Sequence, residues 1–381
     1  MKKLAVFLIT AILMASIIPA YCMDGVIWEK TYDIGREPEE YGSSVATDSN
    51  NNVIVGGVGR NIEGAIIKYS PGGSIIWDFG NEASYLTKIY DVATDSRGNI
   101  IFGGSGVFGK VASNEFSVIW GISTNGSIES VAVDYNDNAL AINSEYNLWK
   151  TDTNGNILPG FPKSLGGILS DPHVSVDSKN NIILTGYLDD TVRSIITLKL
   201  DPNGALIWQK IYEPSGNGGQ GRDVTVDPDD NIVVTGYYND DIITIKYDAN
   251  GNLIWAKTFS VAPKDSLGDG VATDSNGNIF VAGTFDYFNT EKSADYPRWI
   301  ILKYDSNGNL VWTKINSSVD YSYANAITVD SENNIIATGT INVENPSYKE
   351  FIYTVKYQGE QKKKGLPIEF ILKILKNNKN K

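Results

Sequence analysis

Residues 223–259 read DVTVDPDDNIVVTGYYNDDIITIKYDANGNLIWAKTF, and several segments of this stretch have the pattern of short β-strands. Its first part, DVTVD, alternates apolar and polar residues as a half-buried strand does, and PDDN supplies a turn. NIVVTG follows as a second strand and IITIKYD as a third. The sequence ANGN then indicates a hairpin turn into a fourth strand, NLIWAKTF, which carries a tryptophan. The stretch therefore predicts four short antiparallel strands.

The same unit recurs along the chain, and two markers count its copies. The aspartate that closes the first strand occurs seven times, at Asp48, Asp95, Asp134, Asp177, Asp227, Asp274 and Asp330. The lysine of the third strand also occurs seven times, at Lys68, Lys110, Lys150, Lys199, Lys246, Lys303 and Lys356. One such unit cannot bury both of its faces, so the copies must stack against one another. Radial stacking gives a seven-bladed β-propeller.

The tryptophan of the fourth strand is a third marker, and it indicates how the ring closes. It stands at Trp77, Trp120, Trp208, Trp255 and Trp312, whereas blade three has Pro159 in its place. We expect this proline to be tolerated because a fourth strand is an outer edge. Blade seven has no fourth strand after YTVKY (353–357), but DGVIWEKTY (24–32) has that pattern. We therefore predict an all-β ring of four-stranded antiparallel blades, in which the N-terminal strand completes the last blade.

One position of the repeat suggests a special backbone conformation. The second strand ends in glycine in four blades, at Gly186, Gly236, Gly283 and Gly339, and in Asn143 in blade three. Glycine and asparagine are the residues that most readily adopt positive φ. The pattern therefore predicts a left-handed residue at this position.

The first 22 residues have the pattern of a secretory leader. Two lysines precede an apolar run from Leu4 to Ile18, which Thr10 and Ser16 interrupt, and PAYC follows. Cleavage after Cys22 would leave a mature protein without cysteine. Acylation of Cys22 is the alternative, and the bulky Tyr21 before it argues against that reading. We predict a signal peptide over 1–22, a propeller over 23–359 and a secreted or cell-envelope location.

Charge separates the ring from the C-terminal segment, residues 360–381. The leader contributes +2 and this segment +5 to the net charge of −13, which leaves −20 on the ring. An acidic ring repels nucleic acid, so we exclude that partner. The segment contains a short apolar stretch, 366–375, within a lysine-rich sequence. It could make peripheral contact with an anionic surface, act as a sorting tail, pack against the ring, or be a poorly ordered tail.

Two stretches of the repeat resemble a known family. VATDSNGNIFVAGTF (271–285) and IILKYDSNGNLVWTKI (300–315) look like the SBBP-type β-propeller repeats of secreted bacterial and archaeal surface proteins. The resemblance covers 24–357 and is weakest in blades two and three. It implies a seven-bladed propeller outside the cytoplasm. It implies no catalytic residue, because the family is defined by its architecture.

Few residues are suited to catalysis or metal binding. The D-S-N-G-N and D-P-D-D-N turns lack the ligand spacing of a calcium loop, which favours structural turns. His173 is the one histidine, and no G-x-S-x-G surrounds any serine. We therefore predict no catalytic residue, no metal and no cofactor. His173 is expected at the surface or at the channel rim, and a pair of facing carboxylates stays open as an alternative.

Sequence variation is concentrated on one face of the predicted ring. In a four-stranded blade, the loop from the second to the third strand and the link to the next blade emerge on the same face. The richest of these loops are 212–222, 237–241, 284–298, 316–324 and 340–350. The candidate ligand-binding residues in them are Tyr237, Tyr238, Asp240, Asp286, Tyr287, Tyr296, Arg298, Tyr321 and Tyr323. Such aromatic and polar side chains suit a sugar or a protein interface equally well.

These observations predict a monomeric binding or scaffold module that holds an extracellular glycan or an envelope protein. The alternative is a propeller enzyme, a hydrolase or lyase acting on a polysaccharide or lactone. It would use loop carboxylates and His173.

Overall fold

In the computed structural model, the regular secondary structure of the described residues consists of β-strands. The described residues are 25–34, 40–59, 64–80, 87–167, 169–189, 193–213, 218–261, 265–289, 294–316, 321–344 and 348–359, and for 287–289, 294, 295, 344 and 348 only the backbone is described. The predicted leader and tail lie outside these residues. Within them, no helix is long and apolar enough to cross a membrane.

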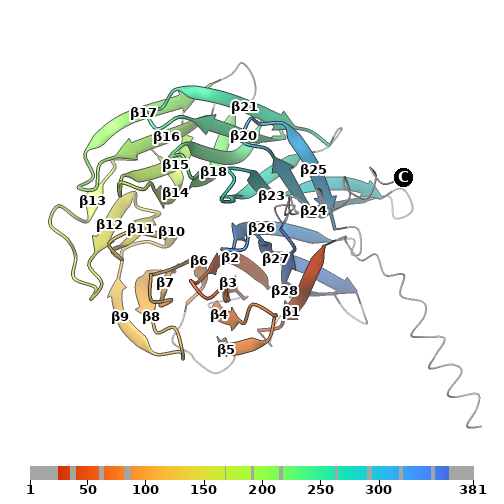
Figure 1. Cartoon of the computed structure of the whole chain (residues 1–381), viewed down its shortest axis with the longest axis horizontal. Coiled ribbons are helices and arrows are strands. Elements are labelled where there is room, and N and C mark those ends of the chain that lie inside the picture. Colours follow the sequence, from red (N-terminus) through yellow and green to blue (C-terminus); the bar gives the residue numbers. More distant parts are fainter. Residues whose placement is uncertain are drawn as a thin grey trace, which may run out of the picture.

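The strands form seven four-stranded antiparallel sheets arranged as a ring, so the predicted seven-bladed propeller is confirmed (Figure 1). Blade 1 consists of β2 (Tyr41–Thr47), β3 (Val53–Val58), β4 (Gly64–Tyr69) and β5 (Ile75–Phe79). Blade 2 consists of β6 (Ile89–Thr94), β7 (Ile100–Gly104), β8 (Val107–Val111) and β9 (Val118–Ser123). Blade 3 consists of β10 (Ile128–Val133), β11 (Ala139–Asn143), β12 (Asn147–Thr151) and β13 (Lys163–Ser164).

The remaining blades follow in chain order around the ring. Blade 4 consists of β14 (Ser170–Val176), β15 (Ile182–Leu188), β16 (Ser194–Leu200) and β17 (Leu206–Tyr212). Blade 5 consists of β18 (Gly219–Val226), β19 (Ile232–Tyr238), β20 (Asp241–Tyr247) and β21 (Leu253–Phe259). Blade 6 consists of β22 (Ser266–Thr273), β23 (Ile279–Asn289), β24 (Ala294–Tyr304) and β25 (Leu310–Ile315). Blade 7 consists of β26 (Ser322–Val329), β27 (Ile335–Glu344), β28 (Tyr348–Tyr357) and β1 (Val26–Tyr32).

The N-terminal strand closes the ring as predicted. In blade 7 the strand order is β1-β28-β27-β26, so the first strand of the chain is the outer strand of the last blade. Figure 1 shows β1 in red beside the blue β28. Trp28 pairs with Lys356 in the register, and the backbone N–H of Gln358 donates to the carbonyl of Gly25 at 2.6 Å. This pairing removes the free edge that β28 would otherwise expose.

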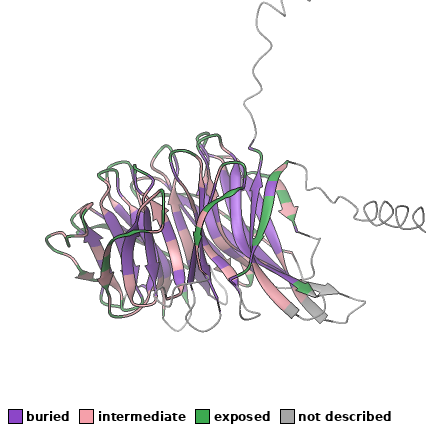
Figure 2. Cartoon of the chain, turned by 90° about the horizontal axis from the view of Figure 1, so that it is seen from below, coloured by how far each residue is buried: buried purple, intermediate pink, exposed green. Residues whose placement is uncertain are grey.

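The hydrophobic core lies between neighbouring blades. One cluster joins Trp28 and Ile352 of blade 7 to Val53 of blade 1, and another joins Ile66 of blade 1 to Ile100 of blade 2. Every residue of β3 and β4 is buried, whereas the outer β5 alternates exposed and half-buried residues. Figure 2 shows buried residues along the strands and exposed residues at the turns. Each blade thus depends on its neighbours for burial.

The repeated aspartate and lysine form buried ion pairs within their blades. The Nζ–Oδ2 distances run from 2.6 to 3.0 Å for Lys68–Asp48, Lys110–Asp95, Lys150–Asp134, Lys199–Asp177, Lys246–Asp227 and Lys356–Asp330. Each aspartate also caps its turn: Asp330 Oδ1 accepts the N–H groups of Glu332 and Asn334, both at 2.9 Å. These turns are Asx-type structures built by the chain itself.

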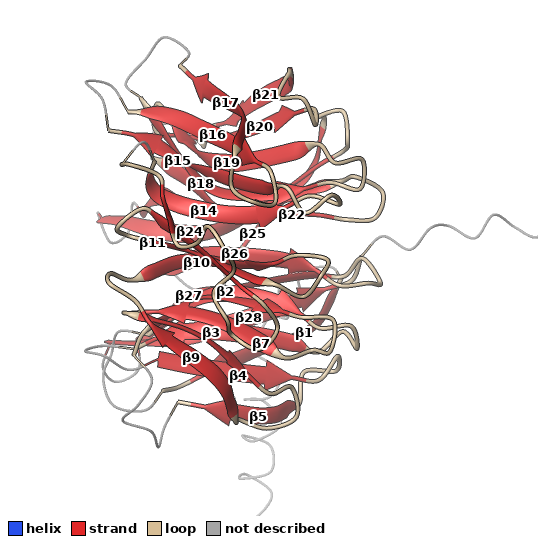
Figure 3. Ribbon diagram, turned by 90° about the vertical axis from the view of Figure 1, so that its left-hand side faces the viewer, coloured by secondary structure: helices blue, strands red, loops and turns tan. Residues whose placement is uncertain are grey.

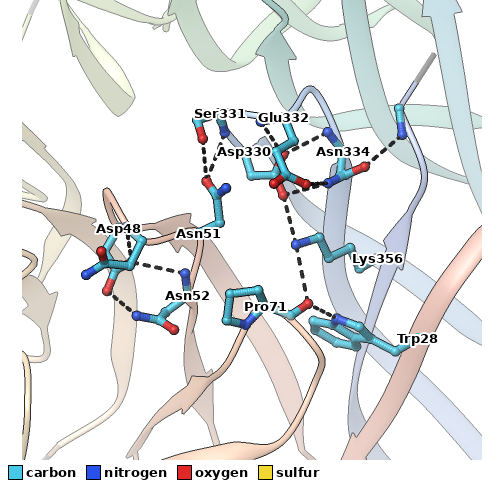
Figure 4. A network of polar contacts seen from close by, with 12 residues as sticks. Trp28, Asp48, Asn51, Asn52, Pro71, Asp330, Ser331, Glu332, Asn334 and Lys356 are labelled. Atoms are coloured by element: carbon cyan, nitrogen blue, oxygen red, sulfur yellow. Dashed lines mark hydrogen bonds and ion pairs between the residues drawn. The ribbon is translucent and has the colours of Figure 1, made fainter. Parts of the chain in front are cut away.

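The lysine and the tryptophan of one blade bind the same carbonyl of the next blade. In the seam between blades 7 and 1, Lys356 Nζ and Trp28 Nε1 both donate to the carbonyl of Pro71, at 3.5 and 2.9 Å (Figure 4). In the next seam, Lys68 and Trp77 both donate to the carbonyl of Ser113. The repeated lysine and tryptophan therefore hold neighbouring blades together, while the aspartate pairs with the lysine inside its own blade.

Two predictions about individual positions were wrong. The glycines at the end of the second strand do not have positive φ. Glycine is needed there because the first strand runs too close: a Cβ on Gly236 would lie 1.9 Å from the carbonyl oxygen of Gln220. Pro159 does not lie on an edge strand either, because it stands in a turn before the two-residue strand β13. Proline lacks the N–H that a longer ladder would need.

Candidate functional site

The two faces of the ring are chemically different. Strands run from one face to the other, as the side view in Figure 3 shows. One face carries the turns after the first and third strands, such as 48–52 and 70–74, and we call it the repeated-turn face. The opposite face carries the loops after the second strands and the links between blades, and we call it the variable face.

A cavity of about 380 Å³ lies at the variable end of the central channel. The first strands of five blades supply most of its lining, namely Tyr41, Ser43, His173, Arg222, Asp269, Tyr323 and Asn325. Thr340 and Glu350, from β27 and β28, complete it. We call this cavity the channel-mouth pocket.

The repeat itself explains why these side chains converge. The residue three positions before the repeated aspartate is valine or isoleucine in every blade, as at Val224, and it packs into the core. The residue five positions before it differs from blade to blade, being Ser43, Tyr90, Glu129, Pro172, Arg222, Asp269 and Asn325. Four of these seven line the pocket. The innermost strands therefore give the channel a different side chain from each blade.

An ion pair between blades 5 and 6 lies in the pocket wall. Arg222 Nε is 2.8 Å from Asp269 Oδ1, and the two side chains are 34% and 14% exposed. Burial raises the pKa of Asp269, although the arginine opposes this shift. A guanidinium carries five N–H donors, and the Nε of Arg222 is the nitrogen that faces Asp269. The pair thus presents both donors and an acceptor to the cavity.

His173 lies in the same pocket, at the channel rim as one of the sequence predictions had it. Burial lowers its pKa to about 4, with Arg222 acting in the same direction and Asp171 opposing it. The imidazole is therefore neutral near pH 7. Asp171 in turn accepts a hydrogen bond from Gln220 Nε2.

Two half-buried carboxylates beside the channel serve the structure. Asp91 of blade 2 accepts hydrogen bonds from Ser44, Ser130 and the N–H of Val131, which links blades 1, 2 and 3. Asp223 of blade 5 accepts the N–H of Val271 of blade 6 at 2.8 Å. Such bonds satisfy backbone groups at the bulges of the first strands.

The nine predicted site residues fall on blades 5, 6 and 7, and Tyr287 pairs with Tyr296 in the register of β23 and β24. Tyr323 lines the pocket, and its hydroxyl donates to that of Tyr321 at 3.2 Å. Tyr237 is half-buried and accepts a hydrogen bond from Arg193 at 3.4 Å, whereas Tyr238 is buried with its ring 6.2 Å from that of Tyr212. Asp240 lies in a turn at positive φ. Asp286, Tyr296 and Arg298 are half-buried on β23 and β24, and for Tyr287 only the backbone is described.

The loop-based reasoning missed Tyr41, Arg222, Asp269 and Asn325, which the structure brings together. The signal for three of them was present in the sequence. When the seven first strands are aligned on their closing aspartate, the fifth position before it is the column that varies. Within the described residues, no cluster of three or more His, Cys, Asp or Glu side chains could hold a metal ion.

Comparisons with known proteins bear on the fold. No protein-family model and no curated protein matches the sequence, so the SBBP-type repeat stays a prediction. Among solved structures, BamB from Moraxella catarrhalis is 14% identical, with a TM-score of 0.52 over 88% of this chain and 98% of that one. The WD40 repeats of RRP9 are 8% identical, with a TM-score of 0.61, and the match covers 87% of this chain and 97% of that one. U3-55K is 8% identical, with a TM-score of 0.61, and the match covers 86% of this chain and 98% of that one. At these identities the likeness shows the propeller fold alone.

Proposed function

We propose that the chain is a binding or scaffold module that holds a glycan or protein partner on its variable face, around the channel-mouth pocket. One observation carries this proposal. The repeated aspartates, lysines and tryptophans are bonded within the ring, whereas side chains that differ between blades meet at one pocket. Residues that the scaffold does not need are thus gathered where a partner can reach them.

Thermal unfolding of the full chain in the presence of soluble envelope polysaccharides tests this proposal. A ligand that binds the folded state raises the unfolding midpoint. We expect one polysaccharide class to raise it for the wild type, and the Tyr323→Ala substitution to abolish the rise. Tyr135→Ala is the matched control, because Tyr135 is 73% exposed on the repeated-turn face. An equal rise in both variants would place the contact elsewhere.

We further propose that the module works outside the cytoplasm, as a secreted or envelope protein. The leader pattern of residues 1–22 supports this location. Expression of the full chain with a C-terminal reporter that is active only after export should give a signal. Deletion of residues 2–22 should remove that signal, and an unchanged signal would refute the location.

An enzyme acting on a polysaccharide or lactone is the second candidate, and one observation favours it. Burial and then the charge of Asp171 raise the pKa of Glu129 to about 7. A carboxylic acid whose pKa lies near 7, and which a second carboxylate influences, resembles a general acid and base pair. Glu129→Gln and His173→Gln should then lower turnover of a polysaccharide without weakening its binding. Unchanged turnover in both variants would remove this candidate.

A further inference from the structure

The channel-mouth pocket combines the groups that recognise a sugar. The Arg222–Asp269 pair offers donors and an acceptor side by side, which matches the vicinal hydroxyls of a sugar ring. The amide of Asn325 donates to the carbonyl of Gly42 at 2.9 Å, which fixes its orientation at the wall. These polar groups belong to three different blades and meet in one cavity.

Two tyrosines supply apolar surface beside these groups. Tyr41 and Tyr323 line the pocket from blades 1 and 7, and both are half-buried. Burial raises the pKa of Tyr41, with Tyr90 and Glu129 acting in the same direction, so its phenol stays neutral. Tyrosine rings pack against the C–H faces of sugars while the hydroxyl bonds with the ring substituents.

The charge of the pocket selects against acidic ligands. Arg222 and Asp269 neutralise each other, and His173 is neutral near pH 7. The ring as a whole is acidic. Uronic acids, sulfated sugars and phosphates would therefore meet repulsion rather than an anion site.

The size of the pocket limits how much of a ligand it takes. A volume of about 380 Å³ lies at the small end of the range for small-molecule sites. This room suits one or two sugar rings rather than a long buried polymer.

We propose that the channel-mouth pocket binds a neutral mono- or disaccharide unit, with hydroxyls bridging Arg222 and Asp269 and a ring face on Tyr41 or Tyr323. This inference rests on the proposed function and assigns a ligand class to the same site. It specifies neutral sugars over acidic ones and over a protein partner.

Saturation-transfer NMR on the full chain tests the inference directly. The probes are glucose, galactose, mannose, N-acetylglucosamine and their disaccharides, with glucuronate and galacturonate as acidic counterparts. The double substitution Arg222→Met/Asp269→Leu removes the pair without leaving a buried charge unpaired. Arg193→Met is the matched control, because Arg193 is an exposed arginine of blade 4 outside the pocket lining.

We expect at least one neutral sugar to bind, and the double variant to bind it about tenfold more weakly or not at all. The control should bind as the wild type does. Absence of binding by every neutral sugar, equal binding of the uronates, or full binding by the double variant would each overturn the inference. A polysaccharide or protein that binds the wild type and is lost in Tyr323→Ala, with no neutral sugar bound, would leave the proposed function standing while rejecting the sugar pocket.

Discussion

The buried pair of aspartate and lysine is the residue-scale unit on which the ring depends. Lys246 Nζ lies 2.8 Å from Asp227 Oδ2 and donates to the carbonyl of Ser306 in the next blade at 3.2 Å. Both side chains are almost fully buried, with 4% and 1% exposed. Removal of the lysine would leave a buried carboxylate and a backbone carbonyl without their partner.

We expect Lys246→Met to lower the free energy of unfolding by roughly 3 kcal/mol or more, since one member of a buried ion pair is lost. Lys257→Met, on the exposed strand β21 of the same blade, should change it by less than about 0.5 kcal/mol. Denaturant unfolding of both variants gives the comparison. Equal stability of the two would show that the pair does not stabilise the ring.

The same pairs predict how stability depends on acid. Burial opposes the charge on Asp227, but hydrogen bonds from Lys246 and Asn231 outweigh it and hold its pKa below the ordinary value. Asp48, Asp95, Asp134, Asp177 and Asp330 shift in the same direction. A folded-state pKa below the unfolded one gives stability that is present above about pH 4 and lost as the pH falls through the folded value.

The unfolding midpoint should therefore fall steeply below about pH 4, and less steeply in Lys246→Met, where Asp227 has lost its partner. Asp223, whose pKa burial raises to about 7, acts in the opposite direction: its contribution to stability grows as the pH falls from about 7 to about 4, and it stays constant once the unfolded-state carboxyl is also protonated. Thermal unfolding between pH 5 and pH 2 measures the slope. A midpoint that stays constant over this range would contradict the role of the pairs.

The sequence predicted which residues repeat, but not all that they contact. The lysine and aspartate columns were visible because every blade needs them. The sequence could not show that Lys246 donates to the carbonyl of Ser306, because this acceptor is a backbone atom 60 positions further along the chain. Arg222 and Asp269 stand in the column that varies between blades, but the sequence did not show that they meet, because the polar side of an innermost strand looks the same in sequence whether it faces solvent or the channel.

At the scale of the element, the turn between the third and fourth strands is a packing surface as well as a connection. In blade 1, Gly73 has a φ of +82°, and a Cβ there would lie 2.8 Å from the ring of Trp28 in blade 7. Gly251 and Gly308 meet Trp208 and Trp255 of the preceding blades in the same way. The glycine of this turn thus allows the tryptophan to reach the next blade.

Gly73→Ala should destabilise the fold by about 1–3 kcal/mol, because it combines an unfavourable φ with a clash against a buried ring. Gly72→Ala is the adjacent control, since a Cβ there meets nothing within 4 Å. Chemical denaturation followed by tryptophan fluorescence compares the two. A larger loss for Gly72→Ala would refute this packing.

The repeat pattern did not predict the course of the outer strand of blade 3 correctly. Its outer strand was expected to run through Pro159, and the structure has instead a bridge between Thr151 and Ile157 followed by the short β13. The repeat pattern gave the number of strands correctly. It could not predict that the outer strand of blade 3 is interrupted, because a proline at an outer edge is compatible with both a continuous and an interrupted strand.

At the scale of the whole molecule, closure by β1 makes the ring continuous. Gly25 and Gln358 are joined by a backbone hydrogen bond of 2.6 Å, so the two ends of the described ring are adjacent. The other blades have a covalent turn at the equivalent place. Because β1 covers the edge of β28, that edge is not open to pairing with another chain.

A circular permutant that joins Gly359 to Gly25 through a short glycine-serine linker, and opens between residues 36 and 37, should fold with an unfolding midpoint near that of the wild type. Deletion of residues 25–34 should lower the midpoint and promote aggregation, because β28 becomes an exposed edge. Light scattering and thermal unfolding measure both variants. A deletion variant as stable and monodisperse as the wild type would mean that closure contributes nothing.

The ring has a structural face and a binding face, and hydrogen–deuterium exchange of the full chain measures which face a ligand protects. The chain is compared with and without a saturating mixture of neutral oligosaccharides. We expect slower exchange in peptides that contain residues 41–43, 222 and 323–325, with no change in the turns 48–52 and 134–138 of the repeated-turn face. Protection of those turns would refute the division into two faces, whereas no protection anywhere would reject the sugar pocket alone.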